Sequence, residues 1–258
     1  RRPVAQCEWN FCGDGADMKQ QRLDHQTSAL AEPIADTLAR WSSEALDLDK
    51  QGAYDWLCSR VKAARVLEIG CGFGASTAAL FRHGKRVFAL DNRMDCLEAA
   101  RARVPEATFG LADIRQVHAL LIQDLAEFAP EAMVLWIAGA PAEALPRDVP
   151  EHYAVMQYRL AFQQAAVALA GQVSSIRTVH VADRTAFPWA MKDAGRETMA
   201  QLITTSVIGA SPFRVTPADV QFRKLQVPVA PMPKGAPTGI VPVLGEATLH
   251  RIEPTAAT

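Results

Sequence analysis

Three glycines at alternate positions, Gly70, Gly72 and Gly74, are the residues of this 258-residue sequence whose spacing most directly predicts chemistry. They follow the apolar run 65–69 and precede a helical pattern that opens at Ala75. Glycine lets a chain turn tightly, and it lets the backbone approach a ligand that a Cβ atom would exclude. The spacing therefore predicts a nucleotide-like ligand at the start of a helix.

Two acids accompany this turn, Glu68 just before it and Asp91 about twenty residues further on, where a carboxylate can accept both hydroxyls of a ribose. The turn also fits the Gly-x-Gly-x-x-Ala pattern of dinucleotide sites, so an NAD(P)-dependent oxidoreductase is one alternative. A pyrophosphate at the helix N-terminus would lie unfavourably close to Glu68. The sulfonium and ammonium groups of S-adenosylmethionine are cations, which a nearby acid favours, so the acids favour this cofactor.

The segment Val66-Leu-Glu-Ile-Gly-Cys-Gly-Phe-Gly-Ala75 resembles the first motif of class I, Rossmann-like methyltransferases that use S-adenosylmethionine. Asp91 matches their second-strand acid, and Asp113 with Ile114 matches the place where these enzymes meet the adenine amino group and cover its ring. The resemblance extends over residues 62 to about 140. It implies a cofactor site made of Glu68 at the amino end, Gly70, Gly72 and Gly74 at the methionine part, Asp91 at the ribose, Asp113 and Ile114 at the adenine, and Phe73 and Asn92 as wall residues.

Two of these residues also have a purely structural interpretation. Glu68 is suited to capping the N-terminus of the following helix, and Asp113 to being the N-cap of a helix that starts at Ile114. A protein that binds the cofactor without catalysis is a further alternative, because the sequence contains no recognisable acceptor motif.

The residues that bind the methyl acceptor are harder to predict from the sequence than those that bind the cofactor, because methyl transfer is an in-line displacement in which a catalytic base is optional. No catalytic residue is predicted. The loop 137–141 lacks the Asn/Asp-Pro-Pro-aromatic pattern of DNA amino-methyltransferases, and no cysteine follows a proline. We expect a small molecule or a protein side chain as acceptor. Loops at the carboxyl ends of the strands supply the candidate contacts, which are Trp136, Gly139, His152, Tyr153, Asp183, Arg184, Phe187 and Trp189.

Apolar runs alternate with helical patterns along the chain, which is the order of βαβ units. Seven strands are expected, at 65–69, 86–90, 107–111, 132–138, 173–181, 220–227 and 247–252. Five helices are expected after the first strand, at 75–83, 94–103, 114–128, 151–170 and 188–208. The sequence therefore predicts an α/β fold with a doubly wound, mostly parallel seven-stranded sheet, helices on both faces and an antiparallel last strand.

Three regions are expected: a flexible arm over 1–23, helices over 24–61, and a Rossmann-like domain over 62–258 with a Pro-rich irregular excursion at 228–245. The helices before the first strand carry Trp41, Tyr54 and Trp56, which suit either a lid over the acceptor or packing against the sheet.

The composition of the chain limits the kinds of partner and the cellular location that we expect for this protein. A formal net charge of -1 with scattered Lys and Arg gives no support for nucleic acid binding. Five cysteines without Cys-x-x-Cys spacing argue against a metal site and a disulfide framework, and indicate a reducing cytoplasm. No apolar run approaches the roughly 20 residues of a membrane span, and Arg1-Arg2-Pro3 does not resemble a signal peptide. The oligomeric state is not predicted.

Overall fold

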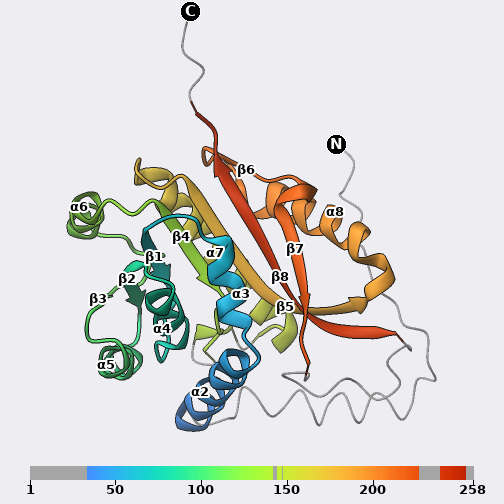
Figure 1. Ribbon diagram of the computed structural model, residues 1–258, viewed down its shortest axis with the longest axis horizontal. Helices are drawn as coiled ribbons and strands as arrows, with labels where there is room; N and C mark the ends of the chain where they lie inside the picture. Colours follow the sequence, from blue (N-terminus) through green and yellow to red (C-terminus); the bar gives the residue numbers. More distant parts are fainter. Residues whose placement is uncertain (1–33, 142–143, 147, 227–238, 254–258) are drawn as a thin grey trace, which may run out of the picture.

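The computed structural model describes residues 34–141, 144–146, 148–226 and 239–253, and its centre is a twisted sheet of eight strands (Figure 1). Neighbouring strands follow the order β3-β2-β1-β4-β5-β8-β6, and β7 also pairs with β8. The strands are β1 Arg65–Ile69, β2 Arg86–Asp91, β3 Thr108–Leu111, β4 Ala132–Trp136, β5 Thr178–Pro188, β6 Phe213–Arg214, β7 Val220–Lys224 and β8 Ile240–Arg251. Strands β1 to β5 are parallel, whereas β8 is antiparallel to β5, β6 and β7. The predicted flexible arm, with Cys7 and Cys12, lies outside the described residues.

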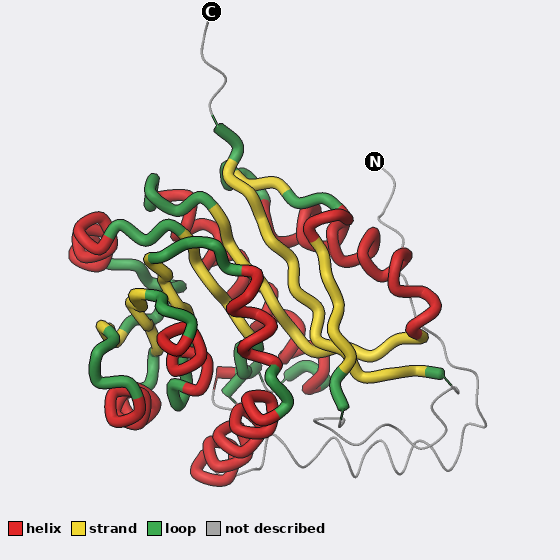
Figure 2. The backbone as a smooth tube through the Cα atoms, in the orientation of Figure 1, coloured by secondary structure: helices red, strands yellow, loops and turns green. Residues whose placement is uncertain are grey.

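Helices cover both faces of the sheet (Figure 2). One face packs against α2 to α5, through a core that joins Val66, Val134 and Trp136 to residues such as Leu57 and Leu80. The other packs against α6 to α8, through a second core. The helices are α2 Ile34–Lys50, α3 Ala53–Arg60, α4 Ala75–Arg82, α5 Met94–Arg103, α6 Ala119–Phe128, α7 Glu151–Gln172 and α8 Lys192–Leu202. The predicted doubly wound α/β fold with an antiparallel last strand is confirmed.

The predicted number of strands is wrong by one. The extra strand is β6, which has only two residues, Phe213 and Arg214, paired with Arg251 and His250 of β8. A segment this short cannot display the alternation of apolar and polar residues by which a strand is predicted.

The predicted bounds of β5 and β8 are also wrong. Residues 173–177 form a turn after α7, and β5 continues to Pro188. Strand β8 starts at Ile240, so the predicted irregular excursion at 228–245 is wrong from Ile240 onward; residues 227–238 lie outside the described part. Pro242 is tolerated in β8 because its carbonyl accepts a hydrogen bond from the Leu225 N–H at 2.9 Å, and no N–H is required of it there.

Two predicted helices differ from those observed. The helix expected from Ile114 begins at Ala119, because the Asp113 side chain accepts the Arg115 N–H at 3.0 Å and closes a turn there. The segment expected as one helix over 188–208 consists of a 3₁₀ turn (Trp189–Met191), α8, and a π-helical turn (Ile203–Ile208). Within the described ranges, no helix has the length and apolarity needed to cross a membrane.

A buried polar cluster ties α3 to the last strand. Glu246 of β8 is fully buried and accepts hydrogen bonds from Arg60 of α3, from His180 Nδ1 at 2.9 Å and from Thr248 Oγ1 at 2.8 Å. Burial alone would raise the pKa of Glu246, but the neighbouring His180 and Arg60 hold it below its usual value. The helices that precede β1 in the chain are thus anchored to the far end of the sequence.

Candidate active site

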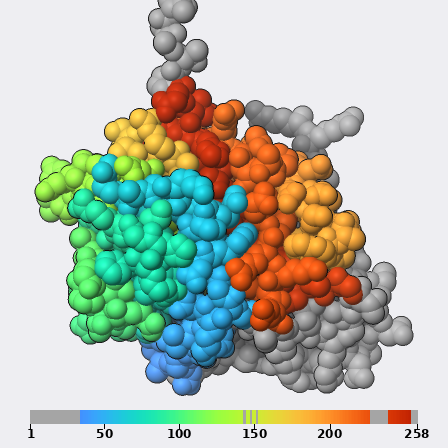
Figure 3. All heavy atoms as spheres, in the orientation of Figure 1, coloured from blue at the N-terminus to red at the C-terminus, as the bar shows by residue number. Residues whose placement is uncertain are grey.

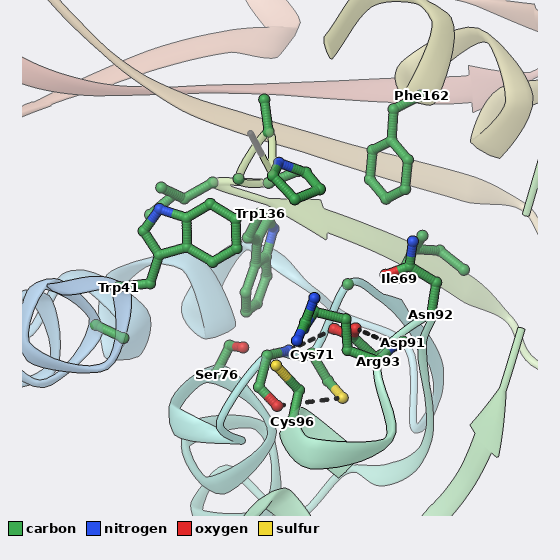
Figure 4. A pocket seen from close by; sticks show the side chains of 18 of the residues that line it. Trp41, Ile69, Cys71, Ser76, Asp91, Asn92, Arg93, Cys96, Trp136 and Phe162 are labelled. Atoms are coloured by element: carbon green, nitrogen blue, oxygen red, sulfur yellow. Dashed lines mark hydrogen bonds between the residues drawn. The ribbon is translucent and has the colours of Figure 1, made fainter. Parts of the chain in front are cut away.

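A cavity of about 720 Å³ lies at the carboxyl ends of the parallel strands, where open α/β sheets bind their ligands (Figure 4). Its floor comes from the ends of β1, β2 and β4 and from the loops that follow them. Its walls come from α2, α7 and β5, and include Trp41, Phe162 and Arg184.

The glycine turn forms one part of the floor. Gly70 and Gly72 have φ angles of +74° and +51°, a left-handed conformation that other residues adopt only with strain. A Cβ atom on Gly72 would meet no atom within 4 Å, so the backbone faces open space there. Both glycines line the cavity together with Phe73.

Gly74 has a different role from the predicted one. It is buried, it does not line the cavity, and a Cβ atom on it would lie 2.9 Å from Ala100 Cα of α5. This glycine allows α4 to pack closely on α5, so it shapes the turn from behind rather than contacting a ligand in the cavity.

Asp91 joins the ends of β1 and β2. Its Oδ2 accepts the Gly72 N–H at 2.9 Å and its Oδ1 accepts the Arg93 N–H at 3.0 Å, so the carboxylate fixes both loops (Figure 4). Burial raises its pKa, while these hydrogen bonds oppose that effect. Asp91 and the exposed Asn92 both line the cavity, in the position predicted for a ribose.

Glu68 lies beneath the turn rather than in the cavity. Its side chain is buried and accepts hydrogen bonds from Ser76 and, at 2.6 Å, from Thr77 Oγ1, both in the first turn of α4. Burial raises the pKa of Glu68 to about 7. Ser76 lines the cavity and Glu68 does not, so the residue predicted to organise the amino end of a cofactor lies one side chain away from the cavity. The interpretation of Glu68 as a residue that caps α4 agrees better with the structure, although its hydrogen-bond donors are the side-chain hydroxyls of Ser76 and Thr77.

Asp113 and Ile114 line the cavity beyond β3. Arg115 donates two hydrogen bonds to Asp113, at 2.9 and 2.7 Å, and this ion pair holds the pKa of Asp113 below its usual range. The helix N-cap interpretation of Asp113 is wrong because α6 starts only at Ala119. Ile114 is buried and offers the apolar surface expected beside an aromatic base.

The loop after β4 is strained. Ile137 has a φ of +55°, which is sterically costly for a β-branched residue, and its N–H donates to the Ala182 carbonyl at 2.8 Å. Such outliers persist where the surrounding structure fixes them, and they cluster at functional sites. Next to it, a Cβ atom on Gly139 would lie 2.7 Å from Trp41 Cζ2, so only glycine lets α2 approach this loop.

The helices before β1 include a wall of the cavity. Residues from successive turns of α2 line it, namely Thr37, Arg40, Trp41, Glu44, Ala45 and Leu48, and α3 adds Tyr54. Burial raises the pKa of Tyr54 far above its ordinary value, so its hydroxyl stays neutral. Trp56 lies outside this cavity and lines a smaller one on the same face of the sheet.

Three predicted acceptor contacts line the cavity: Trp136, Gly139 and Arg184. The structure places the other five outside its lining. His152 and Tyr153 are exposed on the first turn of α7, Phe187 packs against Phe222, and Trp189 lies under Lys224. Asp183 is linked to lining residues by its ion pair with Arg159 at 3.1 Å and by the Arg184 N–H, which it accepts at 2.7 Å.

Sequence reasoning missed the contribution of α7, whose Val155, Tyr158, Arg159 and Phe162 line the cavity. Their spacing is that of one helix face, which was available as a signal. The polar members of this face suggested exposure to solvent, and nothing local in the sequence indicates that the face closes over Gly70.

Residues 66–151, about one third of the chain, match the family model described as "Methyltransferase domain". The chain carries a methyltransferase domain. This confirms the predicted class I resemblance, whose motifs lie in the matched range. The model extends beyond the resemblance noted in the sequence, through the strained β4 loop to the start of α7.

Two curated proteins are similar to parts of this chain. A trans-aconitate 2-methyltransferase from Enterobacter sp. (strain 638) is 36% identical over 110 residues, which are 42% of this chain and 38% of that protein. Another, from Afipia carboxidovorans, is 30% identical over 166 residues, or 52% of this chain and 64% of that protein. The chain thus spans less than two thirds of the length of either relative.

Among solved structures, the magnesium protoporphyrin IX methyltransferase from Synechocystis PCC 6803 aligns with 93% of this chain and 100% of its own. Its TM-score is 0.47 and its sequence identity 13%.

Proposed function

We propose that this protein transfers a methyl group from S-adenosylmethionine to a small-molecule acceptor. The observation that carries the proposal is the joined pair of loops at the cavity floor, where the Asp91 carboxylate holds the N–H of Gly72 in a turn that presents bare backbone to the cavity. The names of the two curated relatives support the same reaction class.

The residues present fit the cofactor. Gly72 leaves open space beside the backbone for the methionine part, Asp91 lines the cavity where ribose hydroxyls would donate to it, and Ile114 gives an apolar contact for the adenine. When bound, S-adenosylmethionine supplies a methyl group on a positively charged sulfur. The carboxylate of Asp91, which lines the cavity at the turn, suits this positive charge.

The chain's own residues position the acceptor rather than deprotonate it. No histidine is among the described residues that line the cavity, and each lining carboxylate is already engaged: Glu44 by arginines, Asp91 by backbone N–H groups and Asp113 by Arg115. Tyr54 stays a neutral hydroxyl. This arrangement fits an acceptor whose nucleophilic atom bears no proton at neutral pH, such as a carboxylate oxygen. Trans-aconitate, which the relatives' name contains, belongs to this class.

A cytoplasmic location is part of the proposal. Cys58, Cys71 and Cys96 are buried free thiols, which fits a reducing compartment.

Calorimetric titration with S-adenosylmethionine and S-adenosylhomocysteine tests the cofactor, and mass spectrometry of small carboxylic acids incubated with protein and S-adenosylmethionine tests the transfer. A folded protein that binds neither cofactor form contradicts the proposal. Binding without turnover on any acceptor would instead indicate a non-catalytic module. Thermal stabilisation by NAD(P)H but not by S-adenosylhomocysteine would favour the oxidoreductase alternative.

A further inference from the structure

The walls of the cavity contain arginines from three different elements: Arg40 of α2, Arg159 of α7 and Arg184 of β5. Two carboxylates accompany them. Glu44 contacts both Arg40, at 3.3 Å, and Arg184, at 3.1 Å, while Asp183 contacts Arg159 at 3.1 Å. Guanidinium groups thus line this wall beside two acids, each of which already holds an arginine.

The pairs of Arg159 and Arg184 leave much of each guanidinium group for another partner. In both, a single Nη1 atom contacts a single carboxylate oxygen, whereas a guanidinium group has five N–H donors in a planar fork. Arg159 Nε is buried and has no hydrogen-bond partner within the described part of the chain. Asp183 does not line the cavity, so it holds Arg159 from outside.

Trp136 adds a donor to the same cavity. Its side chain lies at the end of β4 beside Trp41, it is only 6% exposed, and its buried Nε1 has no hydrogen-bond partner among the residues that the structure describes (Figure 4). A buried N–H without a partner is rare in native proteins and needs an explanation. A ligand oxygen provides one, since Trp136 lines the cavity.

We propose that Arg159 and Arg184, with the Trp136 N–H, form a subsite for a carboxylate group of the methyl acceptor. This inference rests on the proposed function. A planar carboxylate matches the two-pronged guanidinium fork, and a carboxylate oxygen can also accept the Trp136 N–H. The cofactor's own amino-acid carboxylate has the same chemistry, so the test separates these two sources.

The experiment titrates the protein saturated with S-adenosylhomocysteine, so that no turnover occurs, with propane-1,2,3-tricarboxylate and with its neutral triamide. The tricarboxylate is expected to bind at least about tenfold more tightly than the triamide, because a carboxylate forms an ion pair with a guanidinium group and a neutral amide does not. Equal binding of the two probes, or no binding of the tricarboxylate, overturns the subsite. The cofactor titration of the same protein shows separately whether the proposed function stands.

Substitutions locate the subsite. Arg159→Gln and Arg184→Gln are each expected to weaken the tricarboxylate about tenfold or more and to change S-adenosylhomocysteine affinity less than about twofold. Arg196→Gln is the control, because Arg196 also pairs with an acid through its Nη1 atom, Asp193 at 3.1 Å, donates to Gln221 at 3.3 Å and does not line the cavity. Weakened S-adenosylhomocysteine with unchanged tricarboxylate would assign the arginines to the cofactor and overturn the proposal.

Glu44→Gln tests the same subsite through an expected gain in affinity for the tricarboxylate. It removes the carboxylate that competes for Arg184, so tricarboxylate affinity should rise several-fold, which a merely structural role for these residues does not predict. Where Arg184→Gln does not fold, Arg184→Lys keeps the charge without the fork and is expected to lose most of the binding; full binding by the lysine variant contradicts fork recognition.

Discussion

Beneath the glycine turn lies a carboxyl group, that of Glu68, with a pKa of about 7. Burial raises this pKa, the hydrogen bonds from Ser76 and Thr77 lower it, and the nearby Asp91 charge raises it further. The folded protein therefore binds a proton on Glu68 between pH 4.5 and about 7 that the unfolded chain does not bind.

This proton makes stability fall as pH rises. The proton on Glu68 stabilises the folded state fully at a pH below the pKa of Glu68 in the unfolded chain. This stabilisation is lost as the pH rises through the pKa of Glu68 in the folded protein. The free energy of unfolding should therefore fall by about 3 kcal/mol more in the wild type than in Glu68→Gln between pH 4.5 and 8. Urea denaturation at a series of pH values measures the difference; parallel curves for the two proteins would contradict the buried, raised carboxyl.

Asp91 should matter to the cofactor and not only to the turn. Asp91→Asn is expected to weaken S-adenosylmethionine binding by about 1–3 kcal/mol, because it removes the charge from hydrogen bonds to the ribose. Asp95→Asn is the control, since Asp95 pairs with the neighbouring Arg93 at 2.7 Å but does not line the cavity. Unchanged affinity in calorimetric titrations of Asp91→Asn would remove Asp91 from the site.

The contact between α4 and α5 explains the third glycine of the turn. Gly74→Ala adds a Cβ atom 2.9 Å from Ala100 Cα at a φ of +76°, so it combines a backbone cost of about 1–2 kcal/mol with an overpacking cost of about 1–3 kcal/mol.

Gly84→Ala separates these two costs. Gly84 has a φ of +71° with nothing within 4 Å of the added Cβ atom, so this variant should lose only the backbone part. Chemical denaturation of both variants measures the difference. Equal losses would show that α4 and α5 are not in close contact at Gly74.

How far the sequence predicts each element depends on how its residues are buried. Strands β1, β2 and β4 were predicted within two residues at each end, because a strand buried on both faces is a continuous apolar run. The later part of β5 is half exposed and carries the polar residues Asp183, Arg184 and Thr185, so its sequence pattern resembles that of a loop. The same limit applies to the cavity, since Arg159 on α7 gains its role only from packing that no local pattern records.

At the scale of the molecule, the blue residues that include α2 and α3 cover the middle of the face seen in Figure 3, between the green residues that follow them in the chain and the orange residues that include β7. Arg223 of β7 donates to the carbonyls of Gly52 and Gln51, at 2.7 and 2.6 Å, and so holds the connection between the two helices. Arg82 of α4 pairs with Asp49 at 2.8 Å from the other side. The cavity wall formed by α2 is therefore fixed from two directions.

Arg223→Gln should loosen this wall. Two charge-assisted hydrogen bonds are lost, which costs about 2–4 kcal/mol of stability at a partly buried site. Hydrogen exchange should speed up over residues 34–60 more than in the sheet. Lys224→Gln is the neighbouring control, since Lys224 contacts the Trp189 ring instead. Uniform acceleration across the molecule, or none, would contradict a local anchor.

The bond between Arg60 and Glu246 joins residues 186 positions apart, and this separation bears on the order of folding. Contacts between distant parts of a chain form slowly, because the loop between them must close before they stabilise anything. Helix α3 cannot dock fully until β8 has entered the sheet and buried Glu246. During refolding we therefore expect helical circular dichroism to recover first, and the capacity to bind S-adenosylhomocysteine only in the slowest phase.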